Sequence, residues 1–194
     1  MVNLQNGAST IQELFNGDRI FNIPKYQRAY AWDKENYEAF FDDLKNQRGD
    51  KEYFLGTLLF HQKENRKDYE IVDIVDGQQR LTTIIIFMKV IVLKLMKMDS
   101  EFVSNKTFSK FIYDGENYKL ELENENSAFL HESILSKDSK IIKPETPSQS
   151  RLMDAMEYFG NRLNSLELEK IESLYIVLVE LFQILHKSAI RRSL

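Results

Sequence analysis

Five consecutive residues, Asp76 to Arg80, have the composition of a phosphate-binding turn. They read Asp-Gly-Gln-Gln-Arg and lie between a run of β-branched residues and a run of helical periodicity. The first turn of a helix presents unpaired N–H groups and partial positive charge. Gly77 permits close approach of a ligand, Gln78 and Gln79 donate without adding charge, and Arg80 offers a two-pronged guanidinium. The pattern predicts an anion site for a nucleotide or a phosphodiester.

A purely structural interpretation of the same turn stays open. In that interpretation Asp76 only caps the helix, Gly77 only turns the chain, and Arg80 pairs with a surface carboxylate. The residue types alone do not decide between these two interpretations.

A second cluster combines hydrogen-bond donors with aromatic side chains. From Pro24 to Trp32 the chain reads Pro-Lys-Tyr-Gln-Arg-Ala-Tyr-Ala-Trp. Gln27 and Arg28 could face a phosphate while an aromatic ring stacks on a base. The competing interpretation, which we favour for Tyr30 and Trp32, is that the aromatic side chains anchor the core.

Hydrophobic periodicity predicts the elements that must position these two clusters. We expect helices at residues 9–17, 33–47, 78–98, 148–163 and 167–186, the second of them capped by Asp33. We expect strands at residues 53–61, 69–75 and 118–122, the first two forming a hairpin, and an edge strand or extended segment at residues 19–26. Residues 102–113 are a short helix or a strand. The fold class is therefore α/β (α+β), with a small mixed sheet and packed helices.

Length and composition indicate an ordinary globular protein. The 194 residues are 43% hydrophobic, which is enough for a core, and the net charge of -4 excludes a strongly basic DNA-coating protein. The absence of cysteine excludes disulfides, thiolate zinc sites and a cysteine nucleophile. The chain starts without a signal peptide, and lysines interrupt its most apolar stretch, so we expect a cytoplasmic protein with no membrane span.

Three motifs, taken in order and spacing, resemble one known family. They are Pro24-x-Tyr26-Gln27-Arg28-x-Tyr30-x-Trp32, Phe54-Leu55-Gly56-Thr57, and Ile74-Val75-Asp76-Gly77-Gln78-Gln79-Arg80-Leu81-Thr82-Thr83. They are similar to the N-terminal domain of GmrSD-type restriction proteins, specifically over residues 23–87 and faintly over residues 149–163. That family has a fold similar to the ParB and sulfiredoxin nucleotide-binding domains, in which a Gly-x-x-Arg turn at a helix start holds phosphates. Here the run Gly77 to Arg80 fits that turn.

The resemblance implies a role in restriction of modified foreign DNA, as in phage defence. The domain would bind a nucleoside triphosphate, with Mg²⁺ as its companion ion, and whether it also hydrolyses the nucleotide is left open. The family's functional positions carry over to Gln27, Arg28, Asp76 and the run Gly77 to Arg80. In this hypothesis Arg80 and the helix start hold phosphate, Gln27 and Arg28 complete the cradle, and Asp76 is the candidate catalytic residue that orients a water or Mg²⁺.

The chain also departs from the family pattern. We expect residues 1–98 to form the ParB/sulfiredoxin-like nucleotide-binding region and residues 99–194 a mainly helical region. Full-length relatives continue into a Phe-Glu-x-x-Asn-x-Arg-Gly motif and a His-Asn-His nuclease domain, and neither appears before Leu194. We therefore expect a fragment or truncated relative, with the nuclease supplied by a domain or subunit outside this chain. The three histidines lie far apart in sequence, so no metal site is predicted.

Two functions of other classes also remain open. One is a ParB-like module that grips the DNA backbone without hydrolysis. The other is a structural or interaction domain whose helical half docks a partner protein.

Overall fold

A six-stranded mixed sheet organises the computed structural model, which describes residues 7–47, 53–63 and 65–188. The strands are β1 (Gly7–Thr10), β2 (Arg19–Ile23), β3 (Tyr53–Gln62), β4 (Glu70–Asp76), β5 (Leu120–Leu122) and β6 (Phe182–Ser188). Their order across the sheet is β1-β6-β3-β4-β2-β5. Because β4 pairs antiparallel with β3 and parallel with β2, the sheet is mixed at its centre. The predicted α+β class with a small mixed sheet is confirmed.

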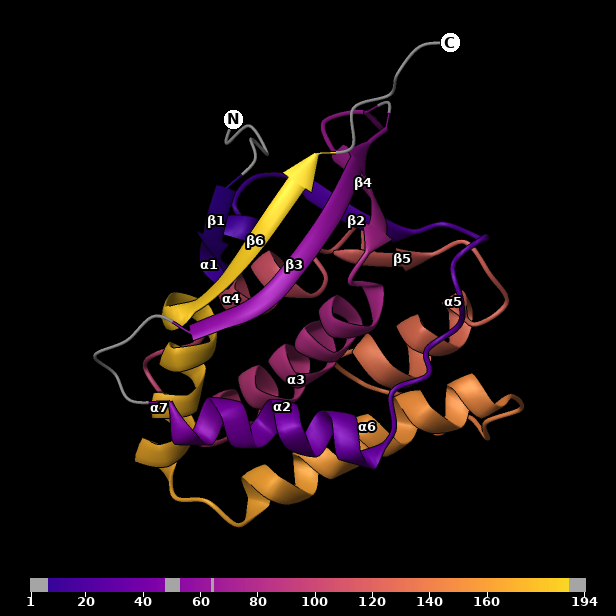
Figure 1. The fold of residues 1–194 in the computed structure, drawn as a ribbon. Helices are drawn as coiled ribbons and strands as arrows, with labels where there is room; N and C mark the ends of the chain where they lie inside the picture. Colours follow the sequence, from indigo (N-terminus) through magenta and orange to yellow (C-terminus); the bar gives the residue numbers. More distant parts are fainter. Residues whose placement is uncertain (1–6, 48–52, 64, 189–194) are drawn as a thin grey trace, which may run out of the picture.

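The helices gather around one long helix, α3, which runs from the end of β4 (Figure 1). They are α1 (Ile11–Leu14), α2 (Lys34–Asn46), α3 (Gln78–Lys97), α4 (Asn105–Phe111), α5 (Ser127–Phe129), α6 (Pro147–Asn164) and α7 (Leu168–Ile176). Two π-helical segments, η1 (Leu130–Leu135) and η2 (Val177–Leu181), continue α5 and α7. Helix α3 contacts α4, α6 and α7, so it is enclosed by other elements along its length.

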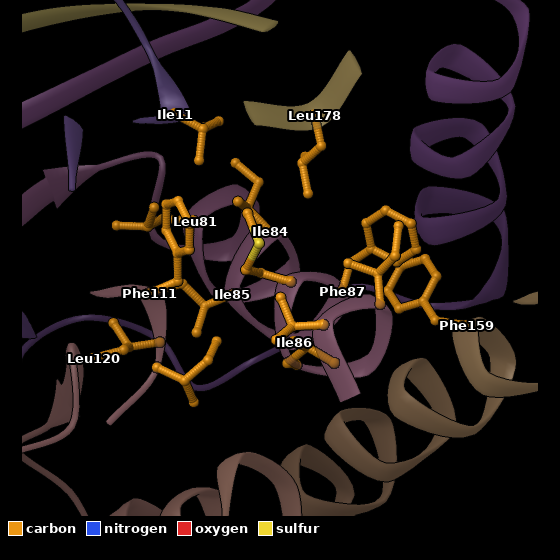
Figure 2. Close-up of a cluster of buried hydrophobic side chains, with 14 of the residues drawn as sticks. Ile11, Leu81, Ile84, Ile85, Ile86, Phe87, Phe111, Leu120, Phe159 and Leu178 are labelled. Carbon is orange, nitrogen blue, oxygen red and sulfur yellow. The ribbon is translucent and has the colours of Figure 1, made fainter. Parts of the chain in front are cut away.

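The sequence of α3 explains its central position. Residues 84–87 are Ile-Ile-Ile-Phe, and all four side chains are buried, so the helix is apolar on every side and must lie inside the fold. Figure 2 shows side chains from other elements packed around it, among them Ile11 of α1, Leu120 of β5, Phe159 of α6 and Leu178 of η2. In the described part of the chain, no helix has both the length and the apolar character that crossing a membrane requires.

An aromatic cluster joins α3 to the two helices beyond it. The ring of Phe87 lies 4.9 Å from that of Phe159 on α6, and 5.8 Å and 5.9 Å from those of Phe40 and Phe41 on α2. Ring pairs at these separations add specific contacts to the area that they bury. Phe87 is therefore the residue through which α2, α3 and α6 share one core.

The residues after position 98 are not confined to a helical layer. They supply α4 to α7, but they also supply β5 at one edge of the sheet and β6 between β1 and β3. One continuous group of buried hydrophobic side chains includes residues from both sides of position 98.

One sequence-based expectation was wrong, and a second was wrong in part. The helix predicted at residues 167–186 ends as α7 at Ile176, and residues 182–188 form β6, because pairing with β1 and β3 on both sides outweighs local helix preference. The segment at residues 19–26 is not an edge strand, since β2 lies between β4 and β5. Pro24 follows the last residue of β2, so its missing N–H does not interrupt the ladder.

The helix expected at residues 9–17 is present only as the short α1, because residues 9–10 belong to β1, and the remaining predicted elements are present. The helices expected at residues 33–47, 78–98 and 148–163 are α2, α3 and α6, and the strands expected at residues 53–61, 69–75 and 118–122 are β3, β4 and β5. Residues 102–113 contain the short helix α4. Asp33 caps α2, as its side chain accepts a hydrogen bond from the Asn36 N–H at 3.4 Å.

One lysine, Lys89 on α3, is buried together with this core. Its side chain is only 6% exposed, and its Nζ donates to Ser139 Oγ at 3.0 Å and contacts Met156 Sδ at 3.7 Å. Within the described residues it has no ion pair with a carboxylate. Burial therefore lowers the pKa of Lys89 to about 8.

The change Phe87→Ala is expected to lower the free energy of unfolding by about 3 to 5 kcal/mol, because it empties the contact between three helices. Denaturant titration measures the loss. The matched control is Ile141→Ala, since Ile141 is fully exposed and its loss should cost less than about 0.5 kcal/mol. Equal effects for the two substitutions would contradict the assignment of Phe87 to the core.

Lys89→Met is expected to stabilise the protein relative to the wild type more at pH 7 than at pH 10. Folded Lys89 loses its proton near pH 8 and the unfolded lysine only near pH 10.4, so the unfolded state binds more protons in that window. The free energy of unfolding of the wild type therefore rises between about pH 8 and pH 10, by up to about 3 kcal/mol. Denaturant titrations between pH 7 and pH 10 measure the trend, with the exposed Lys97→Met as control. If the difference in stability between Lys89→Met and the wild type did not change with pH, the lowered pKa of Lys89 would be contradicted.

Candidate functional site

The predicted turn lies where β4 ends and α3 begins. β4 ends at Asp76, Gly77 is the N-cap residue of α3 with φ +86°, and Gln78 begins the helix. Gly77 has no side chain with which to cap, and the first turn of this 20-residue helix contains no acidic residue. The N–H groups of that turn and the positive end of the helix dipole are thus left for an anion.

The Asp76 carboxylate does not cap the first turn. Its Oδ1 accepts a hydrogen bond of 2.8 Å from the N–H of Gly77, which precedes the helix. Asp76 is exposed, so this bond fixes a carboxylate at the solvent side of the turn. The purely structural interpretation, in which Asp76 is the helix cap, therefore does not describe this turn.

Gly77 is required for a second reason, which is close packing against β3. A Cβ atom at this position would lie 2.9 Å from the backbone oxygen of Thr57 and would overlap the side chain of Leu58. Only glycine fits both this contact and the positive φ. The turn is therefore held tightly against the neighbouring strand.

Arg80 lies across the same strand. Its Nη1 donates to the backbone oxygen of Thr57 at 3.1 Å, and a Cβ atom at Gly56 would lie 2.7 Å from its Cζ. Gly56 thus provides the space that the guanidinium fills. Among the described residues Arg80 forms no ion pair with a carboxylate, in contrast to the structural interpretation of the motif. The motif Phe54-Leu55-Gly56-Thr57 in the sequence does not by itself indicate this role of Gly56.

Two glutamine side chains attach the earlier cluster to this turn. Gln78 Nε2 donates to the backbone oxygen of Arg28 at 3.1 Å. Gln79 is bonded twice, since its Nε2 donates to the oxygen of Ala29 at 3.1 Å and its Oε1 accepts from the N–H of Ala31 at 2.7 Å. Both amides therefore bind the loop that follows β2, and what Gln78 and Gln79 leave for an anion is chiefly their backbone N–H groups.

Two further contacts fix the same loop. Gln27 Nε2 donates to the backbone oxygen of Val75 at 2.8 Å, next to the turn. The hydroxyl groups of Tyr30 and Thr83 are 2.8 Å apart, and Tyr30 is buried. Burial raises the pKa of the Tyr30 hydroxyl. The interpretation of Tyr30 as a core anchor is confirmed.

Beside these contacts lies a hollow of about 540 Å³. It is lined by Gln27, Arg28, Trp32, Asp76, Gly77, Gln78, Gln79 and Arg80. The structure thus brings together, at one place, every residue that the sequence predicted for the site, although the two clusters are about 50 positions apart.

Trp32 is the lining residue that sequence reasoning assigned to the core. It is half-buried and packs against the core, and it also faces the hollow. The sequence signal for its place beside the hollow is that Trp32 follows Arg28 by four residues in the same motif. Trp32 therefore packs against the core and lines the hollow at the same time.

The charge in the hollow is positive on balance. Arg28 and Arg80 contribute two guanidinium groups, and Asp76 is the one carboxylate among the lining residues. Arg28 is exposed, and within the described chain its guanidinium makes no hydrogen bond or ion pair. Its charge is therefore available to a bound anion.

The described residues contain no cluster of three or more acidic, histidine or cysteine side chains that could hold a metal ion. His131 has structural contacts, as its ring stacks 4.1 Å from that of Tyr118 and its Nε2 lies 2.9 Å from the backbone oxygen of Leu120. Burial lowers the pKa of His131. The donor set of the hollow fits magnesium only in the mode in which one carboxylate and phosphate oxygens share the ion.

A family model described as "GmrSD restriction endonuclease, N-terminal domain" matches residues 11–191. No curated protein matches the chain. The matched range contains every residue of the hollow and most of the described structure.

Gly77→Ala is expected to destabilise the protein more than Gly17→Ala. Both glycines have nearly the same positive φ, +86° and +87°, so each substitution costs about 1 to 2 kcal/mol in backbone strain. A Cβ at Gly17 meets nothing within 4 Å, whereas one at Gly77 meets β3, which adds about 1 to 3 kcal/mol. Denaturant titration compares the two. Similar losses would show that the turn is not tightly packed.

Proposed function

Because this chain belongs to the family of the GmrSD restriction endonuclease N-terminal domain, we propose that its hollow binds a nucleoside triphosphate in a restriction system that acts on modified foreign DNA. The observation that supports this most strongly is the uncapped N-terminus of α3, which opens into a hollow with two arginines. The volume of about 540 Å³ lies within the range of small-molecule sites.

The phosphate groups bind at the start of α3. The backbone N–H groups of the first turn donate to phosphate oxygens, and the helix dipole favours their negative charge. Arg80 adds a guanidinium held in place by Thr57 and the space at Gly56. Arg28 lines the same hollow from the loop that follows β2, so in this proposal two cationic groups contact the phosphates.

Asp76 is the proposed catalytic residue for hydrolysis. One carboxylate oxygen is held by the Gly77 N–H, and the side chain lies at the solvent side of the phosphate site. In this proposal Asp76 orients a water against the terminal phosphate, while Arg80 and the N–H groups stabilise the charge that develops. A bound magnesium ion would supply charge neutralisation on the phosphates, with Asp76 as its protein ligand.

The partners in this proposal are the nucleotide, modified DNA and a nuclease domain or subunit. A ParB-like grip on the DNA backbone is the second candidate function, and the exposed and unpaired Arg28 is the observation that favours it. The two candidates differ in the ligand that competes for the hollow.

Arg80→Ala is expected to weaken nucleoside triphosphate binding by roughly 10- to 100-fold, because it removes a charge-assisted contact. Isothermal titration calorimetry with each nucleotide and Mg²⁺ measures the change. The matched control is Arg66→Ala, since Arg66 is exposed and pairs with Glu121 outside the hollow.

Two results would count against the proposal. The first is a wild-type chain that binds no nucleotide at millimolar concentration. The second is salt-dependent binding of duplex DNA that Arg28→Ala abolishes and that nucleotide does not affect, which would favour the DNA-backbone function.

A further inference from the structure

The hollow is polar with one exception. Apart from Trp32, its lining consists of charged side chains, amides and Gly77. Phosphate groups are recognised by N–H donors and positive charge, and the apolar face of an indole ring offers them neither. The aromatic surface therefore indicates that the ligand has a second, flat part besides its anionic part.

Trp32 is held in place on both sides along the chain. The N–H of Ala31, just before it, is bonded to Gln79 Oε1 at 2.7 Å. Asp33, just after it, forms a reciprocal cap with Asn36 that begins α2. The half-buried side chain of Trp32 also packs against the core. A surface fixed in this way loses little conformational freedom when a ligand binds.

We propose that Trp32 is a stacking surface for the nucleobase of the nucleotide whose phosphates lie at the start of α3. This inference rests on the proposed function, and it adds the feature that makes the ligand a nucleotide and not an inorganic polyphosphate. Every nucleobase has a π face, and stacking on an aromatic side chain strengthens binding by about 5- to 150-fold per base. The same glutamine, Gln79, holds the Trp32 loop and lies in the first turn of the phosphate-binding helix, so the two subsites keep a fixed relative position.

The chain offers a direct optical test, since Trp32 is its only tryptophan. The probes are the four common nucleoside triphosphates and inorganic tripolyphosphate, which has the phosphates but no base. We expect a nucleoside triphosphate to bind the wild-type chain more tightly than tripolyphosphate and to change tryptophan fluorescence more strongly at saturation. This measurement uses the wild-type chain, so it does not depend on the folding of any variant.

Calorimetry on three variants tests the same point. Trp32→Leu keeps an apolar side chain but removes the π face, and should weaken nucleotide binding by about 5- to 150-fold without changing tripolyphosphate binding. Trp32→Phe keeps a ring and should retain most of the preference for nucleotide. The matched control is Tyr26→Ala, because Tyr26 lies in the same loop and is 72% exposed but does not line the hollow. Melting temperatures confirm that each variant is folded.

The possible failures can be told apart. If tripolyphosphate and nucleotides bind equally well, and nucleotides leave the fluorescence unchanged, the phosphate site stands and the stacking role is wrong. If Trp32→Leu weakens both ligands equally, Trp32 only shapes the hollow, and the proposal is again overturned. If the wild-type chain binds neither ligand, the proposed function fails and the stacking role fails with it.

Discussion

The structure depends on one constraint: the helix at the centre of the core, α3, also lines the candidate site with its first turn. Its body carries consecutive buried residues at 84–87 and is enclosed by α4, α6 and α7. Its first turn has no side-chain cap and opens into the hollow. A helix fixed by burial along its length cannot shift its N-terminus, so the N–H groups that face the hollow are preorganised.

Glycine in β3 and at the turn makes this arrangement possible. Gly77 brings the turn against Thr57 and Leu58, and Gly56 leaves space for the guanidinium of Arg80. Each glycine removes a side chain where backbone or a charged group must approach closely. The strand and the helix therefore act as one rigid support for the lining of the hollow, although they come from different parts of the chain.

The loop that follows β2 completes the site through hydrogen bonds to its backbone. The side-chain amides of Gln78 and Gln79 bond this backbone, and Gln27 within the loop donates to the Val75 oxygen, so the loop is tied to the end of β4 and the start of α3. Polar side chains at the edge of a functional site thus have two kinds of role, contact with a ligand and positioning of other groups. Here the positioning role explains why uncharged amides line the hollow together with two arginines.

Features that depend on neighbouring residues were determined by the sequence itself. The strand, glycine and helix around Gly77 follow from local periodicity and turn chemistry, as do the cap at Asp33 and the helical pattern of α2, α3 and α6. Features that depend on distant contacts were decided only by the tertiary structure. Residues 182–188 are a strand because β1 and β3 pair with them, and Gly56 matters because of Arg80. Likewise, Trp32 lines the hollow in a loop that is held by Gln78 and Gln79, and such long-range contacts leave no periodic signal in the sequence.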